Sequence, residues 1–261
     1  MQKSPVGLSL EWAQDVRGDA YLLAVNRSDY AQRDFHSGIF WESQLQPFFD
    51  MWCEEAKCAT GVVLDIGANF GAHTLYLARH LAKEVWAFEP QRRVYQQLVS
   101  NCMLNSLANV WTLNGALSTA NAAMEMTDSY FGALASGNQG ARSVKARNPS
   151  GAALPDSDEL IHAFRLDHLW AAMGRPRVPF VKIDVEGHEA SSFEGGRELF
   201  NSRMRPEIVV FEERGRGVGG ASTNASSSSA AREWLRKHGY CFEKIKKTQT
   251  LHAVTLARRC R

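Results

Sequence analysis

The chain has 261 residues, of which 44% are hydrophobic, so it is long enough for one large α/β domain with a sizeable core. Its 30 basic and 28 acidic residues leave a net charge of +2, and overall charge therefore gives no reason to expect binding to nucleic acid or to an anionic membrane. No run approaches the roughly 20 apolar residues that span a bilayer, and charges interrupt the first residues, so we expect neither a membrane span nor a secretory signal.

The cysteines are scattered and form no CxxC pair. This spacing predicts neither a zinc site nor a disulfide framework, and we expect no bound metal. A chain without disulfides or a secretory signal is expected in the reducing cytoplasm. The five cysteines are Cys53, Cys58, Cys102, Cys241 and Cys260.

Residues 1–59 have a mixed pattern and a cluster of aromatic side chains, which we interpret as a helical cap on the rest of the chain. The chain is therefore divided into an N-terminal cap, residues 1–59, and a main domain, residues 60–261. Packing is the favoured role of the cap, and closure of one side of a ligand site is the alternative. The aromatic residues are Phe35, Phe40, Trp41, Phe48, Phe49 and Trp52.

From residue 60 onward, short apolar runs alternate with amphipathic stretches, a pattern that predicts an α/β fold with a mostly parallel sheet. Seven strands are expected, the last two forming a closing pair that supplies an antiparallel edge strand to a sheet of the Rossmann-like kind. The expected strands are residues 62–66, 85–88, 110–113, 179–183, 208–211, 241–245 and 251–256. The expected helices are residues 74–81, 93–105 and 231–238.

Two segments depart from this alternation. Residues 124–155 are rich in Gly, Ser and Asn where the next strand and helix would follow, which predicts an inserted hairpin and loop. Residues 215–230 are of low complexity and cannot bury a core, so we expect a mobile loop. This loop follows the fifth strand at the sheet edge where substrates bind in open α/β sheets. A solvated linker is favoured over a substrate lid.

The strongest motif is VLDIGANFGAHT, residues 63–74, in which a buried strand runs through Asp65 into a glycine turn and then a helix. Gly67 and Gly71 allow a tight turn and a close approach of a ligand to the main chain. A dinucleotide-binding loop would need GxGxxG, but Asn69 and Ala72 replace the two glycines on which the pyrophosphate depends. The turn therefore suits a ligand without phosphates.

A second motif, VWAFEP, ends a neighbouring strand with Glu89, 24 residues after Asp65. A carboxylate in this position accepts hydrogen bonds from the two ribose hydroxyls of an adenosyl group. A ribose-binding acid beside a turn that lacks the pyrophosphate glycines indicates S-adenosylmethionine as the cofactor. The alternative is purely structural, a tight turn followed by a helix-capping acid.

A third motif, VPFVKIDVEGHEA, crowds ionisable groups at the end of a strand. Lys182 and Asp184 share one face of that strand because side chains two residues apart point the same way. Crowded acids at this edge tend to have shifted pKa values that suit acid–base catalysis. We take Asp184 as the first candidate for a catalytic base and Glu186 as the second. The alternative is that both acids cap the next helix, and His188 is interpreted as a surface residue.

In this order, VLDIGANFGAHT, AFEP, KIDVEGHE and RPEIVVFEE resemble the FkbM family of methyltransferases. The resemblance covers roughly residues 36 to 256 and includes smaller matches in SGIFWE, LVSNCMLN, LNGALS, GNQG and FRLDHL. It implies a Rossmann-like methyltransferase fold and an S-adenosylmethionine-dependent O-methyltransferase. The implied acceptor is a hydroxyl of a sugar, a glycan or a glycosylated small molecule. The Ser-rich loop at residues 215–230 is not part of the family pattern.

The resemblance assigns roles to particular positions. Catalytic roles fall on Asp184, Glu186 and Glu189, whose acids match the KIDVEGHE signature. Cofactor contacts are expected at the matching positions and their neighbours, namely Asp65, Gly67, Ala68, Asn69, Phe70, Gly71, Thr74, Glu89, Ala116 and Asp184.

Two other classes of function compete with this one. Methylation of base amino groups usually relies on an Asn/Asp-Pro-Pro-aromatic turn, and this chain has Asp-Val-Glu-Gly at residues 184–187. Ribose 2′-O methylation of nucleic acid stays open as the alternative because it uses a lysine with acids, and Lys182 is present. A non-enzymatic binding module would tolerate loss of the acids after Lys182, all of which are kept. We therefore expect a small-molecule or carbohydrate acceptor and no nucleic-acid partner.

Overall fold

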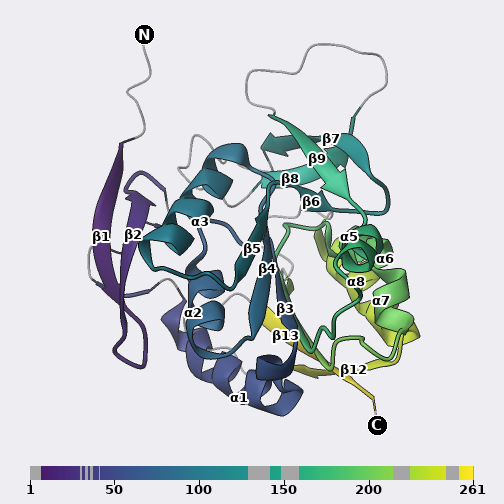
Figure 1. Cartoon of the computed structure of the whole chain (residues 1–261). Helices are drawn as coiled ribbons and strands as arrows, with labels where there is room; N and C mark the ends of the chain where they lie inside the picture. The colour runs from purple at the N-terminus through teal and green to yellow at the C-terminus, as the bar shows by residue number, and fades with distance from the viewer. Residues whose placement is uncertain are drawn as a thin grey trace.

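The computed structural model describes residues 7–29, 31–32, 35, 38–40, 42–128, 142–147, 159–213, 224–244 and 253–260. Its main sheet has seven strands in the order β12-β13-β11-β10-β3-β4-β5 (Figure 1). They are β3 (Val62–Ile66), β4 (Glu84–Phe88), β5 (Val110–Leu113), β10 (Phe180–Ile183), β11 (Ile208–Glu213), β12 (Tyr240–Lys244) and β13 (Ala253–Arg259).

The sheet is mostly parallel, as predicted. β3 pairs in parallel with β4 and β10, β4 with β5, and β10 with β11. β13 runs antiparallel to both of its neighbours, β11 and β12. The prediction of an antiparallel edge strand is wrong in its position, because the second strand of the closing hairpin pairs with β11 and leaves β12 at the edge.

Helices cover both faces of this sheet (Figure 1), which is why its central strands are short, continuous apolar runs. One face packs against α1 (Gln46–Ala56) and α2 (Ala72–His80), with α3 (Arg92–Leu104) beside them. The other face packs against α5 (Leu166–Ala172), α6 (Glu189–Gly195), α7 (Arg197–Asn201) and α8 (Asn224–Lys237). Side chains alternate between the two faces in β3: Val63 packs on the face covered by α1 and α2, whereas Val62 and Leu64 pack on the face covered by α5 to α8.

A second, smaller sheet has the order β6-β9-β7-β8 and lies over one end of the main sheet (Figure 1). Its strands are β6 (Ala116–Leu117), β7 (Ala122–Asp128), β8 (Arg142–Ala146) and β9 (Glu159–Phe164). The antiparallel pair β7–β8 confirms the hairpin predicted at residues 124–155, whose remaining residues lie outside the described part. β9 was not predicted, because its half-buried alternation lies beside a loop-like composition.

The expectation of a helical cap at residues 1–59 is wrong for its first half. β1 (Leu8–Gln14) and β2 (Ala20–Asn26) form an antiparallel hairpin. Apolar and polar residues alternate over the first residues of LSLEWAQ with the period of a strand, although Leu8, Leu10 and Trp12 are exposed and Ala13 is the buried residue. Helical structure follows in η2 (Ser43–Leu45), α1 and η3 (Cys58–Thr60), with Pro47 in the first turn of α1.

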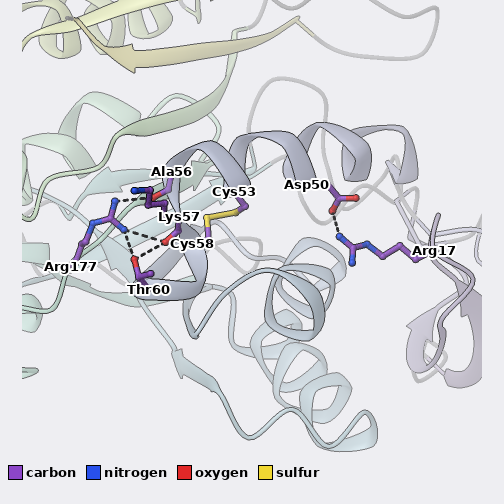
Figure 2. Close-up of a disulfide and its surroundings, with 8 residues drawn as sticks. All are labelled: Arg17, Asp50, Cys53, Ala56, Lys57, Cys58, Thr60 and Arg177. Carbon is purple, nitrogen blue, oxygen red and sulfur yellow. Dashed lines mark hydrogen bonds and ion pairs between the residues drawn. A yellow bond between two sulfur atoms is a disulfide. The ribbon is translucent and has the colours of Figure 1, made fainter.

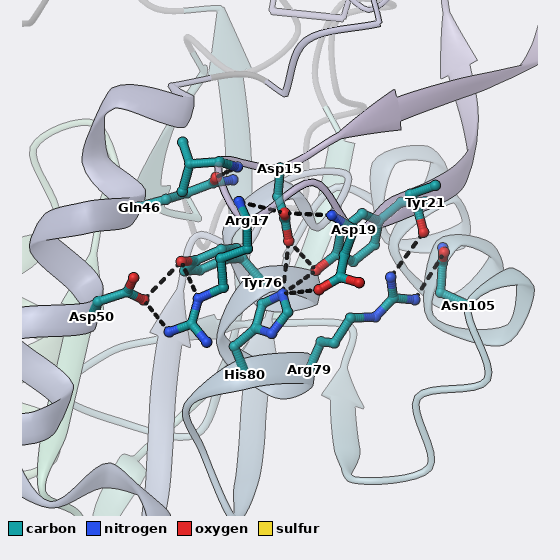
Figure 3. Close-up of polar contacts among 12 residues, drawn as sticks. Asp15, Arg17, Asp19, Tyr21, Gln46, Asp50, Tyr76, Arg79, His80 and Asn105 are labelled. Carbon is teal, nitrogen blue, oxygen red and sulfur yellow. Dashed lines mark hydrogen bonds and ion pairs between the residues drawn. The ribbon is translucent and has the colours of Figure 1, made fainter.

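Polar contacts attach the N-terminal hairpin to α2 (Figure 3). Asp15 Oδ2 accepts a hydrogen bond from Tyr21 and lies 2.7 Å from His80 Nε2. Its Oδ1 accepts hydrogen bonds from the backbone N–H groups of Arg17 and Asp19. Burial opposes the charge of Asp15, but the hydrogen bonds outweigh burial and hold its pKa below the ordinary value. The hairpin is therefore fixed to the main domain by a carboxylate whose two oxygens are both engaged.

The prediction from cysteine spacing that the chain has no disulfides is wrong. Cys53 pairs with Cys58, and Cys241 pairs with Cys260, while Cys102 is a buried free thiol. Cys53 lies in the last turns of α1 and meets Cys58 in η3, directly after the helix ends (Figure 2). These pairings depend on local turns and strand register rather than on a CxxC pattern. They also remove one of the observations on which the cytoplasmic expectation rested.

Loss of the Cys241–Cys260 disulfide is expected to lower the free energy of unfolding by about 3 kcal/mol, and loss of Cys53–Cys58 by about 2 kcal/mol. The difference follows from the sequence separations of 19 and 5 residues, because a longer closed loop restricts the unfolded chain more. Denaturant unfolding of the paired Cys→Ser variants, with and without reductant, measures both values. Five free thiols in the untreated protein would contradict the pairing.

The prediction of a loop at residues 215–230 is also partly wrong. α8 begins at Asn224, so the last part of this segment is helical, whereas residues 215–223 lie outside the described part. Apolar residues of the helix, such as Ala231 and Leu235, anchor α8 in the core, and a helix that is anchored there extends through the preceding Ser and Ala residues. Across the described residues, no helix has the length and apolar character needed to cross a membrane.

Candidate active site

The glycine turn joins β3 to α2 at the carboxyl edge of the sheet. The N–H groups of Gly67 and Ala68 both donate to the carbonyl of Phe88 at the end of β4. Gly67 has φ +77°, and a Cβ on it would lie 1.9 Å from the carbonyl oxygen of Asp184. Glycine is required here because the ends of β3 and β10 approach too closely for any side chain.

Asn69 occupies the position where a dinucleotide-binding loop would have glycine. Its φ of 53° lies in the left-handed region, which asparagine tolerates better than most residues. Its side-chain oxygen accepts a hydrogen bond from the Phe70 N–H at 2.8 Å, and its own N–H donates to Glu89 Oε2 at 3.0 Å. Asn69 thus closes the turn and ties it to the acid at the end of β4.

Glu89 is buried between the glycine turn and α3. Its two oxygens accept hydrogen bonds from the backbone N–H groups of Asn69 and Gln91, and each oxygen retains a second lone pair. Burial raises the pKa of Glu89 to about 7, although the two backbone hydrogen bonds and the charge of Lys182 act in the opposite direction. Glu89 therefore changes charge near neutral pH.

Asp65 and Lys182 form a buried ion pair beneath the turn. Lys182 Nζ lies 3.3 Å from Asp65 Oδ1 and donates to the carbonyl of Gly67 at 3.0 Å, while Thr74 donates to Asp65 Oδ2 at 2.6 Å. Burial opposes the charge of Lys182, but the carboxylates of Asp65, Asp184 and Glu42 outweigh burial and hold its pKa above the ordinary value. Asp65 and Thr74 therefore stabilise the turn through Lys182, which donates to the carbonyl of Gly67.

Three cavities meet at this edge. The apolar cavity is lined mainly by Ile66, Phe88, Pro90, Ala116, Met126 and Val144. The polar cavity is lined by Ala68, Asn69, Phe70, His73, Glu89 and Lys182, among others. The acidic cavity is lined by Glu42, Phe49, His73, Asp184, Phe211 and Glu212, among others.

Asp184 lines all three cavities. It directly follows β10, and its N–H donates to the carbonyl of Ile66 at the end of β3. Gly67 and Glu89 line both the apolar and the polar cavity, so those two cavities meet across the glycine turn. Asp184 is therefore the acid that stands where a ligand of the turn and a ligand of the acidic cavity would meet.

The other predicted acids lie elsewhere in the KIDVEGHE segment. Glu186 has a left-handed backbone, with φ 55°, and lines the apolar cavity. Glu189 is buried in the first turn of α6 and accepts a hydrogen bond from the Gly187 N–H, and burial raises its pKa. His188, interpreted as a surface residue, is largely buried beside Ser118, and burial lowers its pKa. Of the three predicted catalytic acids, Asp184 alone lines the acidic cavity.

Four residues that the sequence motifs did not single out also line the cavities: Glu42, His73, Arg142 and Glu212. His73 Nε2 lies 3.0 Å from Glu42 Oε2. Arg142 in β8 is buried and donates to the carbonyl of Met126, so the second sheet closes the apolar cavity. Glu212 lies one residue before the end of β11. It belongs to the RPEIVVFEE motif, and its position beside Asp184 follows from the parallel pairing of β10 with β11.

Comparison with known proteins identifies the family. A model of the methyltransferase FkbM domain matches residues 65–242, whereas no curated protein matches the chain significantly. The 16S rRNA N2 G1207 methyltransferase RsmC of T. thermophilus, solved with AdoMet and guanosine, superposes with a TM-score of 0.53. Its sequence identity is 13%, over 98% of this chain and 52% of RsmC. This chain thus spans about half of the length of RsmC.

Two further solved structures have lower TM-scores. A putative O-methyltransferase from Klebsiella pneumoniae has a TM-score of 0.48 and 15% identity, over 84% of this chain and 81% of its own. Cofactor-bound Rv0187 from MTB has a TM-score of 0.46 and 17% identity, over 82% of this chain and 79% of its own. The match to the family model extends from Asp65, before the glycine turn, to Phe242 in β12, and the chain therefore belongs to the FkbM family of methyltransferases.

Proposed function

We propose that this protein is an S-adenosylmethionine-dependent O-methyltransferase of the Rossmann-like type, whose acceptor is a hydroxyl of a sugar, a glycan or a glycosylated small molecule. The observation that carries the proposal is the position of Asp184 at the junction of the three cavities. A carboxylate there adjoins both the glycine turn and the cavity that an acceptor would enter.

The residues of the turn fit this cofactor. Glu89 keeps two lone pairs for the ribose hydroxyls, and the turn lacks the glycines that a pyrophosphate needs. The apolar cavity, with Ala116 on its wall, suits the adenine ring. The polar cavity, with Asn69 and Lys182, suits the charged amino-acid end. These residues would hold the cofactor without any phosphate contact.

When bound, S-adenosylmethionine supplies a methyl group that is already activated by a sulfonium. The protein must align the acceptor oxygen and exclude water, and such positioning supplies most of the acceleration in many enzymes. As the acceptor oxygen takes the methyl group it loses its proton, and Asp184 is placed to accept that proton. Glu186, on the wall of the apolar cavity, is the second candidate for this role.

The acidic cavity favours a carbohydrate acceptor over nucleic acid. Glu42, Asp184 and Glu212 line it together, and carboxylates accept hydrogen bonds from sugar hydroxyls but repel phosphates. Its lysine, Lys182, forms an ion pair with Asp65, which reduces its attraction for a phosphate.

The test is transfer of label from methyl-labelled S-adenosylmethionine to a panel of sugars, glycolipid precursors and RNA. Incorporation into the hydroxyls of a carbohydrate acceptor, lost in the Asp184→Asn variant, supports the proposal. Incorporation into RNA ribose, with none into carbohydrate, would replace it with the nucleic-acid alternative.

Replacing Glu89 with Ala is expected to weaken cofactor binding by about 1.5–3 kcal/mol, because hydrogen bonds to a charged acceptor are lost. Since the pKa of Glu89 is raised to about 7, its carboxylate gains a proton as the pH falls below 7. The affinity for S-adenosylhomocysteine should therefore fall by about tenfold between pH 8 and pH 6. Titration calorimetry at both pH values measures this change.

Glu89→Gln is the matched control, because an amide has nearly the same shape and does not titrate in this range. Its affinity should vary less with pH than that of the wild-type protein, and any remaining change is then due to the ligand itself. Equal pH dependence in the two proteins, or unchanged affinity in Glu89→Ala, would show that Glu89 does not hold the ribose.

A further inference from the structure

Two carboxyl groups lie near the carboxyl ends of neighbouring strands, beside the acidic cavity. β10 and β11 run parallel with Ile183 opposite Phe211, so Asp184 and Glu212 follow at the same level. Both side chains line the acidic cavity, and a hydrogen bond joins them. A hydrogen bond between two carboxyl groups needs a proton on one of them, so the pair shares a proton.

The surrounding charges decide which carboxyl group holds this proton. Glu212 faces acids: Asp184 after β10, Glu42 before η2 and Glu189 at the start of α6. Asp184, in contrast, is attracted by the buried ammonium of Lys182. Burial and the neighbouring acids raise the pKa of Glu212 to about 8. At neutral pH the proton therefore resides on Glu212.

The remaining groups around the pair do not change this assignment. His73 of α2 lies across the acidic cavity, where its Nε2 contacts Glu42. β13 contributes Val254, which is apolar. Among the described residues, the charged groups that face the pair include two carboxyl groups, Glu42 and Glu189, and one lysine whose pKa lies above its ordinary value.

We propose that Glu212 is a positioning residue for methyl transfer: its protonated carboxyl group donates a hydrogen bond to one oxygen of Asp184 and leaves the other oxygen for the acceptor hydroxyl. This inference rests on the proposed function, in which Asp184 is the base. During transfer, the proton of the acceptor hydroxyl passes to the second oxygen of Asp184, while Glu212 keeps its own proton. Glu212 thus holds the base in place without taking part in the bond changes.

A pH dependence follows. Above pH 8, Glu212 loses its proton, and the hydrogen bond is replaced by repulsion between two adjacent carboxylates. Turnover should therefore fall on the alkaline side. Glutamine at position 212 keeps a hydrogen-bond donor and cannot ionise, so the alkaline fall should disappear in Glu212→Gln.

The test measures kcat at saturating cofactor and acceptor from pH 6.5 to 9.5. Wild-type protein and Glu198→Gln, which removes an exposed carboxylate on α7, should lose about fivefold or more on the alkaline side. Glu212→Gln should stay within about threefold of the wild type at pH 7.5 and show no alkaline fall, and Glu212→Ala should lose about tenfold or more. An unchanged alkaline fall in Glu212→Gln, or full activity in Glu212→Ala, would overturn the proposal.

A second measurement needs no activity. A carboxyl group whose pKa is higher in the folded than in the unfolded protein stabilises the fold at low pH, and this contribution is lost as the pH rises through the folded-state pKa. The unfolding free energy of the wild type should therefore decline between pH 5 and pH 8.5 more than that of Glu212→Gln. Identical declines would overturn the shared proton.

The two measurements separate the two proposals. If the wild type transfers no methyl group but the stability difference is present, the proposed function fails and the carboxyl pair stands. If Glu212→Gln does not fold, Asp184→Asn takes its place in the stability comparison, because loss of the acidic partner should also reduce the alkaline decline. An Asp184→Asn decline equal to that of the wild type would overturn the pair.

Discussion

Asp184→Asn is expected to lower turnover by about 10²–10⁴-fold while cofactor affinity changes little. The amide keeps the size of the carboxylate and cannot accept the hydroxyl proton. Asp184 lines the apolar, polar and acidic cavities at once, and in the proposed function its carboxylate lies between the residues that would hold the cofactor and the cavity that the acceptor would enter. Single-turnover rates and calorimetric affinities, measured on the same preparations, provide the two quantities.

Asp19→Asn is the matched control, because Asp19 lies in the N-terminal hairpin, is half exposed and lines none of the three cavities. It should turn over like the wild type. If Asp184→Asn loses cofactor affinity in step with turnover, Asp184 holds the cofactor instead. If its turnover survives, the base is Glu186 or another group, or the reaction needs none.

Gly67→Ala is expected to destabilise the fold by about 1–3 kcal/mol more than a glycine replacement that meets only backbone strain. The reason is the carbonyl oxygen of Asp184, which would lie 1.9 Å from the new Cβ, so that β3 and β10 must separate at their ends. Cofactor binding should be lost along with the geometry of the turn. Thermal unfolding and titration calorimetry measure the two effects.

Gly174→Ala isolates the backbone strain. Gly174 has φ +82°, close to the +77° of Gly67, but a Cβ there would meet nothing within 4 Å. Both variants suffer the strain of a positive φ, and the difference between them is the clash with Asp184. Equal stabilities, or normal cofactor binding in Gly67→Ala, would show that the close approach of β3 and β10 does not shape the site.

The sequence predicted the main sheet well because its strands are short apolar runs that end in recognisable turns. The runs at residues 62–66 and 110–113 match β3 and β5 to the residue. It failed in the N-terminal hairpin, where the alternation in β1 covers only a few residues before Ala13 interrupts it. It also failed for the disulfides, since Cys241 and Cys260 are brought together by the pairing of β12 with β13, which spacing alone does not reveal.

The site was predictable where the motif residues are neighbours along the chain. Gly67 and Glu89 belong to two motifs whose strands pair directly, and they meet as expected at the glycine turn. Glu42 and Glu212 come from distant segments, and they join Asp184 through the packing of η2 and β11 around β10. The motifs SGIFWE and RPEIVVFEE contain these two acids but did not single them out, because only the fold shows that they lie beside Asp184.

The most direct test of the account is a calorimetric titration of the wild-type protein with S-adenosylmethionine, and separately with NAD. The turn lacks the two glycines that a pyrophosphate needs, and we propose that Glu89 holds the ribose. The account predicts saturable binding of S-adenosylmethionine at one site per chain and no binding of NAD. Tight binding of NAD, with no heat from S-adenosylmethionine, would contradict it.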